Sequence, residues 1–530
     1  MTAADVIAAR LHAAGVRHAF GIPGGEVLSL VDALTRAGIA FHLARHENAA
    51  GFMAEGAWHA SGAPGVLVAT VGPGIANAFN VVANAEQDRV PLLVLSGMVD
   101  PAEQLTYTHQ VFEHAAVFAR VTKASLRAEP GAVGTVIDKA LAIAMEPRKG
   151  PVHVDLPVAL AAAAEPAPGP VRRGPVLPTA PGAGAALDAA RARLSAAERP
   201  VIVAGLDILE EPGGPAALAA FAERHGVPVV TTYKAKGVLP EDHPLCLGGH
   251  GLSPKSDAIL MPALARSDCV IAAGYDPIEM RTGWRDPWDP EVAIEFAHAP
   301  NRHDMHHAAL SWTCSVAGGL AALDGAREPG PDWLAETRAA LRQAFAPGAG
   351  WGPDVALAEL LEALPAEAVV TADSGAHRIL LSQLPLARRP RALLQSTGLC
   401  TMGCALPLAL GHAIAEPGRP AVAVMGDAGL EMILGELATL RDSGRPVVAV
   451  VLADRSLSLI EKKQRAMQLP NAGVDFAATD FAALARVYGG RGVTVRGPGE
   501  AGPALAEALS ADRFTVIAVE LPRRAYDGLF

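Results

Sequence analysis

The chain has 530 residues, of which 51% are hydrophobic and 19% are charged, and its formal net charge at pH 7 is −11. A chain of this length does not fold around one hydrophobic core, so three to four domains are expected. The negative charge argues against nucleic acid or an anionic membrane surface as the main partner. It leaves an anionic ligand open, because a bound metal ion reverses the local field.

The N-terminal stretch and the cysteines indicate where the protein works. Residues 1–16 have the pattern of an amphipathic helix with Asp5 and Arg10, and not that of a signal peptide. The five cysteines form no CxxC pair, which fits a reducing compartment. No apolar run is long enough to cross a bilayer. We therefore expect a soluble, cytoplasmic protein.

Two segments rich in proline, glycine and alanine divide the chain into three parts of similar size. They cover residues 161–186 and 323–333, and their composition is typical of inter-domain linkers. The predicted domains are residues 1–165, 185–325 and 345–530.

Each part alternates short apolar strands with helical stretches. The expected strands lie within 17–25, 41–47, 65–74, 91–97 and 151–157, then 200–208, 228–237, 269–276 and 292–298, and finally 368–375, 420–429, 446–456 and 514–522. Strands that alternate with helices predict parallel sheets covered by helices on both faces. We therefore predict three Rossmann-like α/β domains, of which the first and third follow one plan.

In the first part, glycines and a glutamate mark two strand ends. Gly24 and Gly25 follow the first expected strand, and Glu47 lies where the second strand gives way to a helix. Taken alone, Glu47 is explained by a favourable interaction with the helix dipole.

In the third part, residues 396–415 read "STGLCTMGCALPLALGHAIA". Gly398, Gly403 and Pro407 interrupt a helix start and leave Met402 on a turn. Without further context Met402 is an ordinary core methionine. Cys400 and Cys404 lie one helical turn apart and are expected in the core rather than as metal ligands.

Two aspartates follow neighbouring apolar strands of the third part. Asp427 ends the run "AVAVMGD", and Asp454 ends "VVAVVLAD" 27 residues later. Ligands of parallel sheets bind at the carboxyl ends of the strands. Two carboxylates and a nearby backbone carbonyl would suit Mg²⁺, and the glycines around Asp427 would let backbone N–H groups approach a phosphate. The alternative is two solvated aspartates that cap helices.

Together these stretches resemble enzymes that depend on thiamine diphosphate (ThDP), specifically the acetolactate synthase (acetohydroxyacid synthase) branch. "GDAG" with its second strand end, "RHENAAGFMAEG", "VGPGIANAFN", "VPLLVLSG", "GPVHVDLP" and "TMGCALPLALG" match that family's motifs in the expected order. The resemblance covers nearly the whole chain. It implies a pyrimidine-binding, a central and a diphosphate-binding domain.

The resemblance implies roles around the aminopyrimidine ring of ThDP. Glu47 would bind the ring's N1′ atom and relay the proton taken from thiazolium C2. Met402 would hold the bent cofactor, and the carbonyl of Cys400 would orient the 4′ amino group. Of the family's Phe-Gln-Glu loop only Gln110 carries over, as a second catalytic residue. The other contacts expected here are Gly24, Gly25, Pro73 and Asn77.

At the diphosphate, the resemblance implies that Asp427, Asp454 and the Ser456 carbonyl bind Mg²⁺ and that His377 contacts the phosphates. The other expected contacts are Gly375, Gly426, Ala428 and Gly429. The chain departs from the family pattern at three positions. Ala428 replaces a glycine, Asp454 replaces the usual asparagine, and Ala376 replaces a glutamine. Asp454 adds a negative charge beside the diphosphate, so we expect weaker or more Mg²⁺-dependent binding.

The expected activity is carboligation or cleavage on a small 2-oxo acid or aldehyde. A decarboxylase that releases an aldehyde, a flavin-dependent oxidase of the same fold and a catalytically inactive regulatory protein are the alternatives. The turn "ATVGPGIAN" lacks the histidine that decarboxylases often carry, which favours carboligation. The adjacent pair His306 and His307 is expected on the surface.

FAD binding and assembly are the last expectations. "AAGYDPIEMRTGWRDPWDP" lacks the first arginine of the family's FAD segment, so FAD is doubtful, and Arg281 corresponds to the second arginine, at the active-site entrance. We expect a homodimer or homotetramer whose sites lie between subunits. The reason drawn from the sequence is the helix at 48–60, which is apolar around much of its circumference and needs burial on several sides.

Overall fold

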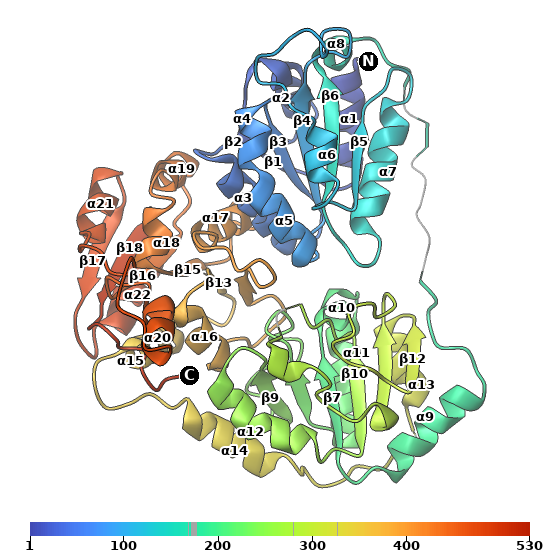
Figure 1. Cartoon of the computed structure of the whole chain (residues 1–530), viewed down its shortest axis with the longest axis vertical. Helices are drawn as coiled ribbons and strands as arrows, with labels where there is room; N and C mark the ends of the chain where they lie inside the picture. Colours follow the sequence, from blue (N-terminus) through green and yellow to red (C-terminus); the bar gives the residue numbers. More distant parts are fainter. Residues whose placement is uncertain (168, 171–176, 279, 326) are drawn as a thin grey trace.

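The protein was analysed as a computed structural model, which describes residues 1–167, 169–170, 177–278, 280–325 and 327–530. It contains three six-stranded, all-parallel sheets, each flanked by helices (Figure 1). The predicted class of three Rossmann-like α/β domains is confirmed. Parts of both predicted linkers and of the segment compared with the FAD motif lie outside the described residues.

The first domain has the strand order β2-β1-β3-β4-β6-β5. Its strands are β1 (His18–Ile22), β2 (Ala40–Leu43), β3 (Gly65–Ala69), β4 (Leu92–Met98), β5 (Ala124–Arg127) and β6 (Val152–Pro157). Its helices are α1 (Ala3–Ala13), α2 (Leu28–Arg36), α3 (Glu47–Ser61), α4 (Pro73–Asn77), α5 (Phe79–Gln87), α6 (His114–Phe118), α7 (Val133–Met145) and α8 (Val158–Ala162), with a 3₁₀ turn η1 (Gly25–Val27).

The third domain repeats this plan in the order β14-β13-β15-β16-β18-β17, which confirms that the two domains share one topology. Its strands are β13 (Val369–Ala372), β14 (Leu393–Gln395), β15 (Ala421–Gly426), β16 (Val448–Ala453), β17 (Arg491–Val495) and β18 (Thr515–Glu520). Its helices are α15 (Pro353–Ala363), α16 (Ala376–Gln383), α17 (Ala405–Ala415), α18 (Asp427–Glu431), α19 (Glu436–Ser443), α20 (Ser458–Ala466), α21 (Phe481–Val487) and α22 (Ala501–Leu509).

The central domain has the order β12-β11-β10-β7-β8-β9, the doubly wound arrangement with its switch point between β7 and β10. Its strands are β7 (Pro200–Ala204), β8 (Val229–Thr231), β9 (Cys246–Gly249), β10 (Cys269–Ala273), β11 (Ala293–Ala297) and β12 (Leu310–Thr313). Its helices are α9 (Ala185–Ala196), α10 (Leu206–Glu210), α11 (Gly214–His225), α12 (Pro254–Leu264) and α13 (Val316–Leu323), with η2 (Thr282–Trp284) and η3 (Pro290–Val292). Helix α14 (Ala335–Ala344) packs Leu341 into the core of this domain.

Five strands were not expected from the sequence: β5, β9, β12, β14 and β17. All five lie at sheet edges and have three to five residues. Strands β5 and β17 also hold several half-buried residues. Edge strands face neighbours on one side only and need no continuous apolar run, so hydrophobic pattern alone does not reveal them.

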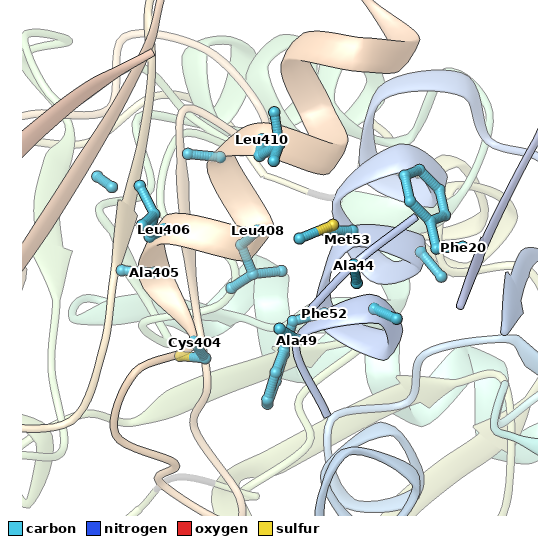
Figure 2. Close-up of a cluster of buried hydrophobic side chains, with 14 of the residues drawn as sticks. Phe20, Ala44, Ala49, Phe52, Met53, Cys404, Ala405, Leu406, Leu408 and Leu410 are labelled. Atoms are coloured by element: carbon cyan, nitrogen blue, oxygen red, sulfur yellow. The ribbon is translucent and has the colours of Figure 1, made fainter. Parts of the chain in front are cut away.

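Helix α3 of the first domain packs against α17 of the third (Figure 2). Glycines bring the two backbones together, because a Cβ on Gly411 would lie 1.9 Å from the Met53 carbonyl oxygen and one on Gly56 would lie 2.2 Å from that of Leu408. Residues 49–58 are buried by this contact and by the first-domain sheet, all within one chain. The reason given for a subunit interface on this helix is therefore wrong.

In the part of the chain that the structure describes, no helix combines the length and the apolar character that a membrane span requires.

Candidate active site

The carboxyl ends of β13, β15 and β16 surround a cavity of about 120 Å³, here called the third-domain cavity. Strands β15 and β16 are neighbours in the sheet, which is why the side chains that follow them meet. The lining includes nine of the residues selected from the sequence: Gly375, His377, Met402, Gly426, Asp427, Ala428, Gly429, Asp454 and Ser456.

Two buried carboxylates dominate the electrostatics of the third-domain cavity. Burial raises the pKa of Asp427 to about 6, the backbone N–H groups of Arg455 (2.7 Å) and Ala428 (2.8 Å) oppose this rise, and the charge of Asp454 adds to it. Burial also raises the pKa of Asp454, whose carboxylate accepts a hydrogen bond from Ser458. Two oxygen donors at adjacent strand ends fit a hard divalent cation, which would compensate both charges.

The backbone around these carboxylates is kept close by glycine. A Cβ on Gly429 would lie 2.2 Å from Asp373 Oδ2, and one on Gly375 would lie 2.5 Å from the His377 ring. Ala428 lies inside α18, where helical dihedral angles accept a methyl group. The cradle therefore tolerates alanine at the one position where the family pattern has a further glycine.

Asp373 couples His377 to the loop of residues 396–404, here called the Met402 loop. One oxygen of Asp373 contacts His377 Nε2 at 2.8 Å, and the other accepts the N–H of Gly403 at 2.7 Å. Met402 lines both the third-domain cavity and a second cavity of about 630 Å³ beside the start of α3. It is thus placed between two cavities.

The expectation that Cys400 lies in the core is wrong. Helix α17 begins at Ala405, so Cys400 stands on the Met402 loop, exposed and with φ of +56°. Its thiol donates to the Thr397 carbonyl at 2.8 Å and accepts from Arg378 at 3.4 Å. Cys404 is buried as predicted.

Asp88, at the end of α5, holds the Met402 loop from the first domain. Its buried carboxylate accepts the N–H (3.1 Å) and hydroxyl (2.6 Å) of Thr397 and the N–H of Gly398 (2.7 Å). Lys234 of the central domain lies 3.5 Å from the same carboxylate. No pattern in "AEQDRVP" marks Asp88, because its partners lie in segments far away in the chain.

Glu47 is the first residue of α3 and is 5% exposed. Asn77, at the end of α4, donates to Glu47 Oε2 at 3.1 Å, and a Cβ on Gly74 would lie 3.4 Å from Oε1. Gly24 packs against Thr70, since a Cβ there would lie 2.2 Å from the Thr70 hydroxyl oxygen. These residues meet at the carboxyl ends of β1 and β3.

The remaining first-domain residues are more exposed. Gly25 has open space around it, and Pro73 begins α4 at the surface. Gln110 is exposed and has a φ of +59°. It packs against Gly72, because a Cβ built on Gly72 would lie 2.6 Å from the Cβ of Gln110.

A buried polar network anchors the loop that carries Gln110. His114 Nδ1 and the Ser96 hydroxyl both lie 2.7 Å from Asp155 Oδ1, and the His153 ring lies between Ser96 (2.7 Å) and Ser125 (2.8 Å). These hydrogen bonds hold the pKa of Asp155 well below its usual range, although its burial acts in the opposite direction. His114 follows Gln110 by four residues, so the network fixes the end of the loop.

Members of the two sets of residues meet at the second cavity and not at the third-domain cavity. Gly24, Gly25, Glu47 and Gln110 are all described, and none of them lines the third-domain cavity. The cavity of about 630 Å³ is lined by His46 and Asn48, which flank Glu47, and by Asn77, Cys400 and Met402.

In the central domain, the surface placement of His306 is wrong. His306 is buried and contacts Glu295 at 2.7 Å, between the rings of Tyr275 and Trp288, whereas His307 is exposed. Arg281 is 44% exposed and lies 3.8 Å from Asp257.

Comparison with known proteins gives three family-model matches, in chain order. They are "Thiamine pyrophosphate enzyme, N-terminal TPP binding domain" over residues 1–119, the central domain of the same enzymes over 187–323, and their C-terminal TPP binding domain over 373–519.

Among curated proteins, the chain is 28% identical to acetolactate synthase of Bacillus subtilis, over 95% of this chain and 90% of the relative. It is 32% identical to the probable 2-ketoarginine decarboxylase AruI of Pseudomonas aeruginosa, over 92% of this chain and 88% of the relative. It is 30% identical to acetolactate synthase of Mycobacterium bovis, over 92% of this chain and 83% of the relative.

We predict that Asp88→Asn loosens the Met402 loop, because an amide offers one acceptor where the carboxylate serves four donors, the Asn84 amide included, and Lys234. The expected cost is about 1–3 kcal/mol of unfolding free energy, with faster hydrogen exchange in residues 396–404. Denaturant titration and exchange mass spectrometry measure both. Asp32→Asn, which removes an exposed carboxylate paired with Arg36, should change neither. Unaltered exchange in Asp88→Asn would show that the carboxylate does not hold the loop.

Proposed function

Because the chain belongs to the family of thiamine pyrophosphate (ThDP) enzymes, we propose that it forms or cleaves the carbon–carbon bond next to the carbonyl of a small 2-oxo acid, with Mg²⁺ as second cofactor, in the manner of acetolactate synthases. The observation that carries the proposal is the set of carboxylates, glycines and Met402 around one cavity at the strand ends of the third domain.

Asp427, Asp454 and the Ser456 carbonyl would hold Mg²⁺, with His377 and the backbone at Gly375, Gly426, Ala428 and Gly429 around the diphosphate. The buried, mutually repelling carboxylates and the glycine cradle fit such a group. Bound ThDP supplies the nucleophilic carbon that attacks the substrate carbonyl.

In the first domain, Glu47 would exchange a proton with the N1′ atom of the aminopyrimidine ring. Asn77 holds Oε2 and thereby leaves Oε1 for this exchange. Gly24, Gly25 and Pro73 would border the ring, and Gln110 would contact the reacting groups from its loop. From the third domain, Met402 would support the ring and the Cys400 carbonyl would orient its amino group.

We also propose that the active unit is a homodimer or a homotetramer. The support is the likeness to acetolactate synthases, which implies sites shared between subunits, and Glu47 and Gln110 do not line the cavity that holds Asp427 and Asp454. The five free cysteines favour a reducing compartment, and we place the protein in the cytoplasm. FAD is no part of the proposal.

A second candidate is a decarboxylase that releases the aldehyde. The relative with 32% identity, the highest among the three relatives named above, carries the name of a probable 2-ketoarginine decarboxylase. Mass spectrometry after incubation of a 2-oxo acid panel with ThDP and Mg²⁺ separates the candidates, because pyruvate yields acetolactate or acetoin by carboligation and acetaldehyde by decarboxylation. A regulatory protein without activity would show no exchange of the C2 proton of bound ThDP.

We predict that Glu47→Gln lowers turnover by a factor of about 10² to 10⁴, the usual scale for an acid–base group. The fold and diphosphate binding should survive, because the amide occupies the same space. Steady-state rates and the C2 hydrogen–deuterium exchange of bound ThDP measure the effect. Near-wild-type turnover would refute the role of Glu47.

We predict that Asp427→Ala abolishes ThDP retention, since the diphosphate would face Asp454 without a firmly held cation. Asp454→Asn should leave binding unchanged or tighten it, because the amide keeps an oxygen ligand and removes one negative charge. Calorimetric titration with ThDP at several Mg²⁺ concentrations compares the two. Loss of binding in Asp454→Asn would contradict the assignment of that position.

We predict that inactive Glu47→Gln and inactive Asp427→Ala chains restore partial activity when they are co-expressed. A mixed dimer contains one site that draws an intact Glu47 from one chain and an intact Asp427 from the other. Differently tagged chains purified in tandem provide verified heterodimers, and homodimers of each variant are the controls. An inactive heterodimer, or an active monomer in sedimentation, would exclude shared sites.

A further inference from the structure

A second carboxylate, Glu26, stands beside the proposed catalytic residues without a part in the proposed chemistry. It belongs to η1, directly after Gly24 and Gly25, and is half-buried. Its Oε2 accepts the Thr70 hydroxyl at 2.5 Å. A Cβ on Gly97, near the end of β4, would lie 2.7 Å from that of Glu26. Glu26 therefore lies over the carboxyl ends of β1, β3 and β4.

Thr70 links Glu26 to the surroundings of Glu47. A Cβ built on Gly74 would lie 2.8 Å from the Thr70 methyl group and 3.4 Å from Glu47 Oε1. One threonine side chain thus stands between the two carboxylates. Within the described residues, no Lys, Arg or His forms an ion pair with Glu26, so its charge is not neutralised by this chain.

The loops that follow the three neighbouring strands β1, β3 and β4 are acidic as well. Residues 23–27, 70–77 and 99–113 follow β1, β3 and β4 and contain no lysine or arginine. They carry four carboxylates: Glu26, Asp100, Glu103 and Glu113. Such a rim attracts a cationic group and repels a second anion.

We propose that Glu26 binds a cationic group, an ammonium or a guanidinium, at the far end of the substrate's side chain. The inference rests on the proposed function and names its substrate class: 2-oxo acids with a positively charged side chain. A carboxylate pairs with such groups through short, charge-assisted hydrogen bonds, and with guanidinium through two at once. A substrate with an apolar side chain would leave the Glu26 carboxylate without a cationic partner. A substrate with an acidic side chain would be repelled by it.

The test compares kcat/KM of the holoenzyme for three 2-oxo acids whose side chains differ in charge. They are 5-guanidino-2-oxopentanoate (cationic), 2-oxoheptanoate (neutral) and 2-oxoglutarate (anionic). The wild type should prefer the cationic acid over the neutral one by a factor of about 10 to 100, the worth of a hydrogen bond to a charged group. Glu26→Gln should remove this preference, chiefly through KM for the cationic acid.

Matched variants separate recognition from other roles. Glu103→Gln removes one charge from the same rim without touching Thr70 and should keep the preference. Glu26→Asp keeps the charge and should retain part of the preference, which preserves the test where Glu26→Gln fails to fold. C2 proton exchange of bound ThDP should be the same in wild type and Glu26→Gln, because the inferred contact is to the substrate alone.

Three results would overturn the inference. The wild type could prefer the neutral or the anionic acid. Glu26→Gln could lower kcat/KM equally for all three acids or slow C2 exchange, which would assign Glu26 to the cofactor. Glu26→Gln could weaken subunit association with the preference intact, which would assign it to the interface. Absence of both C2 exchange and turnover in the wild type is a different outcome, in which the proposed function itself fails.

Discussion

One buried carboxylate holds the Met402 loop at the point where the three domains meet. Asp88 comes from the first domain, the donors on Thr397 and Gly398 come from the third, and Lys234 comes from the central domain. A carboxylate this deeply buried is stable only when it is paired and fully hydrogen-bonded, so each partner fixes the others. Three domains thereby fix a loop that carries the side chain proposed to support the cofactor.

The first and third domains share one topology but place different residues at the ends of their strands. Helices α3 and α17 pack through glycine, so the first and third domains share one hydrophobic core. The third domain places acids and a histidine at its strand ends, which suits a cation and phosphates. The first places Glu47, Asn77 and Thr70 there, which suits hydrogen bonds to a heteroaromatic ring. The two domains share one strand order and differ in the residues that follow each strand.

Much of the fold could be predicted from the sequence, because central parallel strands are buried on both faces and appear as apolar runs. The edge strands were missed because they have a neighbour on one side only and need no continuous apolar run. Asp427 and Asp454 could be predicted because each follows a recognisable strand, whereas Gly375, His377, Met402 and Ser456 were expected from the family motifs. Asp88, Thr70 and Glu26 could not be predicted, since their roles depend on contacts between segments far apart in the chain. Cys400 was misplaced because a four-residue spacing suggests a helix, and the backbone there is left-handed.

The burial of α3 within one chain removes the physical reason, drawn from the sequence, for expecting a dimer. Hydrophobic pattern shows that a helix must be covered and does not show by what, and here α17 of the same chain covers it. The expectation of a second subunit rests on the likeness to acetolactate synthases, because within this chain Asn77, the partner of Glu47, lines one cavity with Met402.

The central claim is that ThDP and Mg²⁺ bind at the third-domain cavity and are completed by Glu47 of another copy. The most direct measurement is a crystal structure of the chain grown with both cofactors. The account predicts the metal between Asp427 and Asp454, Met402 against the bent cofactor, and the aminopyrimidine N1′ within hydrogen-bond distance of Glu47 from the partner subunit. A cofactor bound elsewhere, or one enclosed by a single chain, would contradict it.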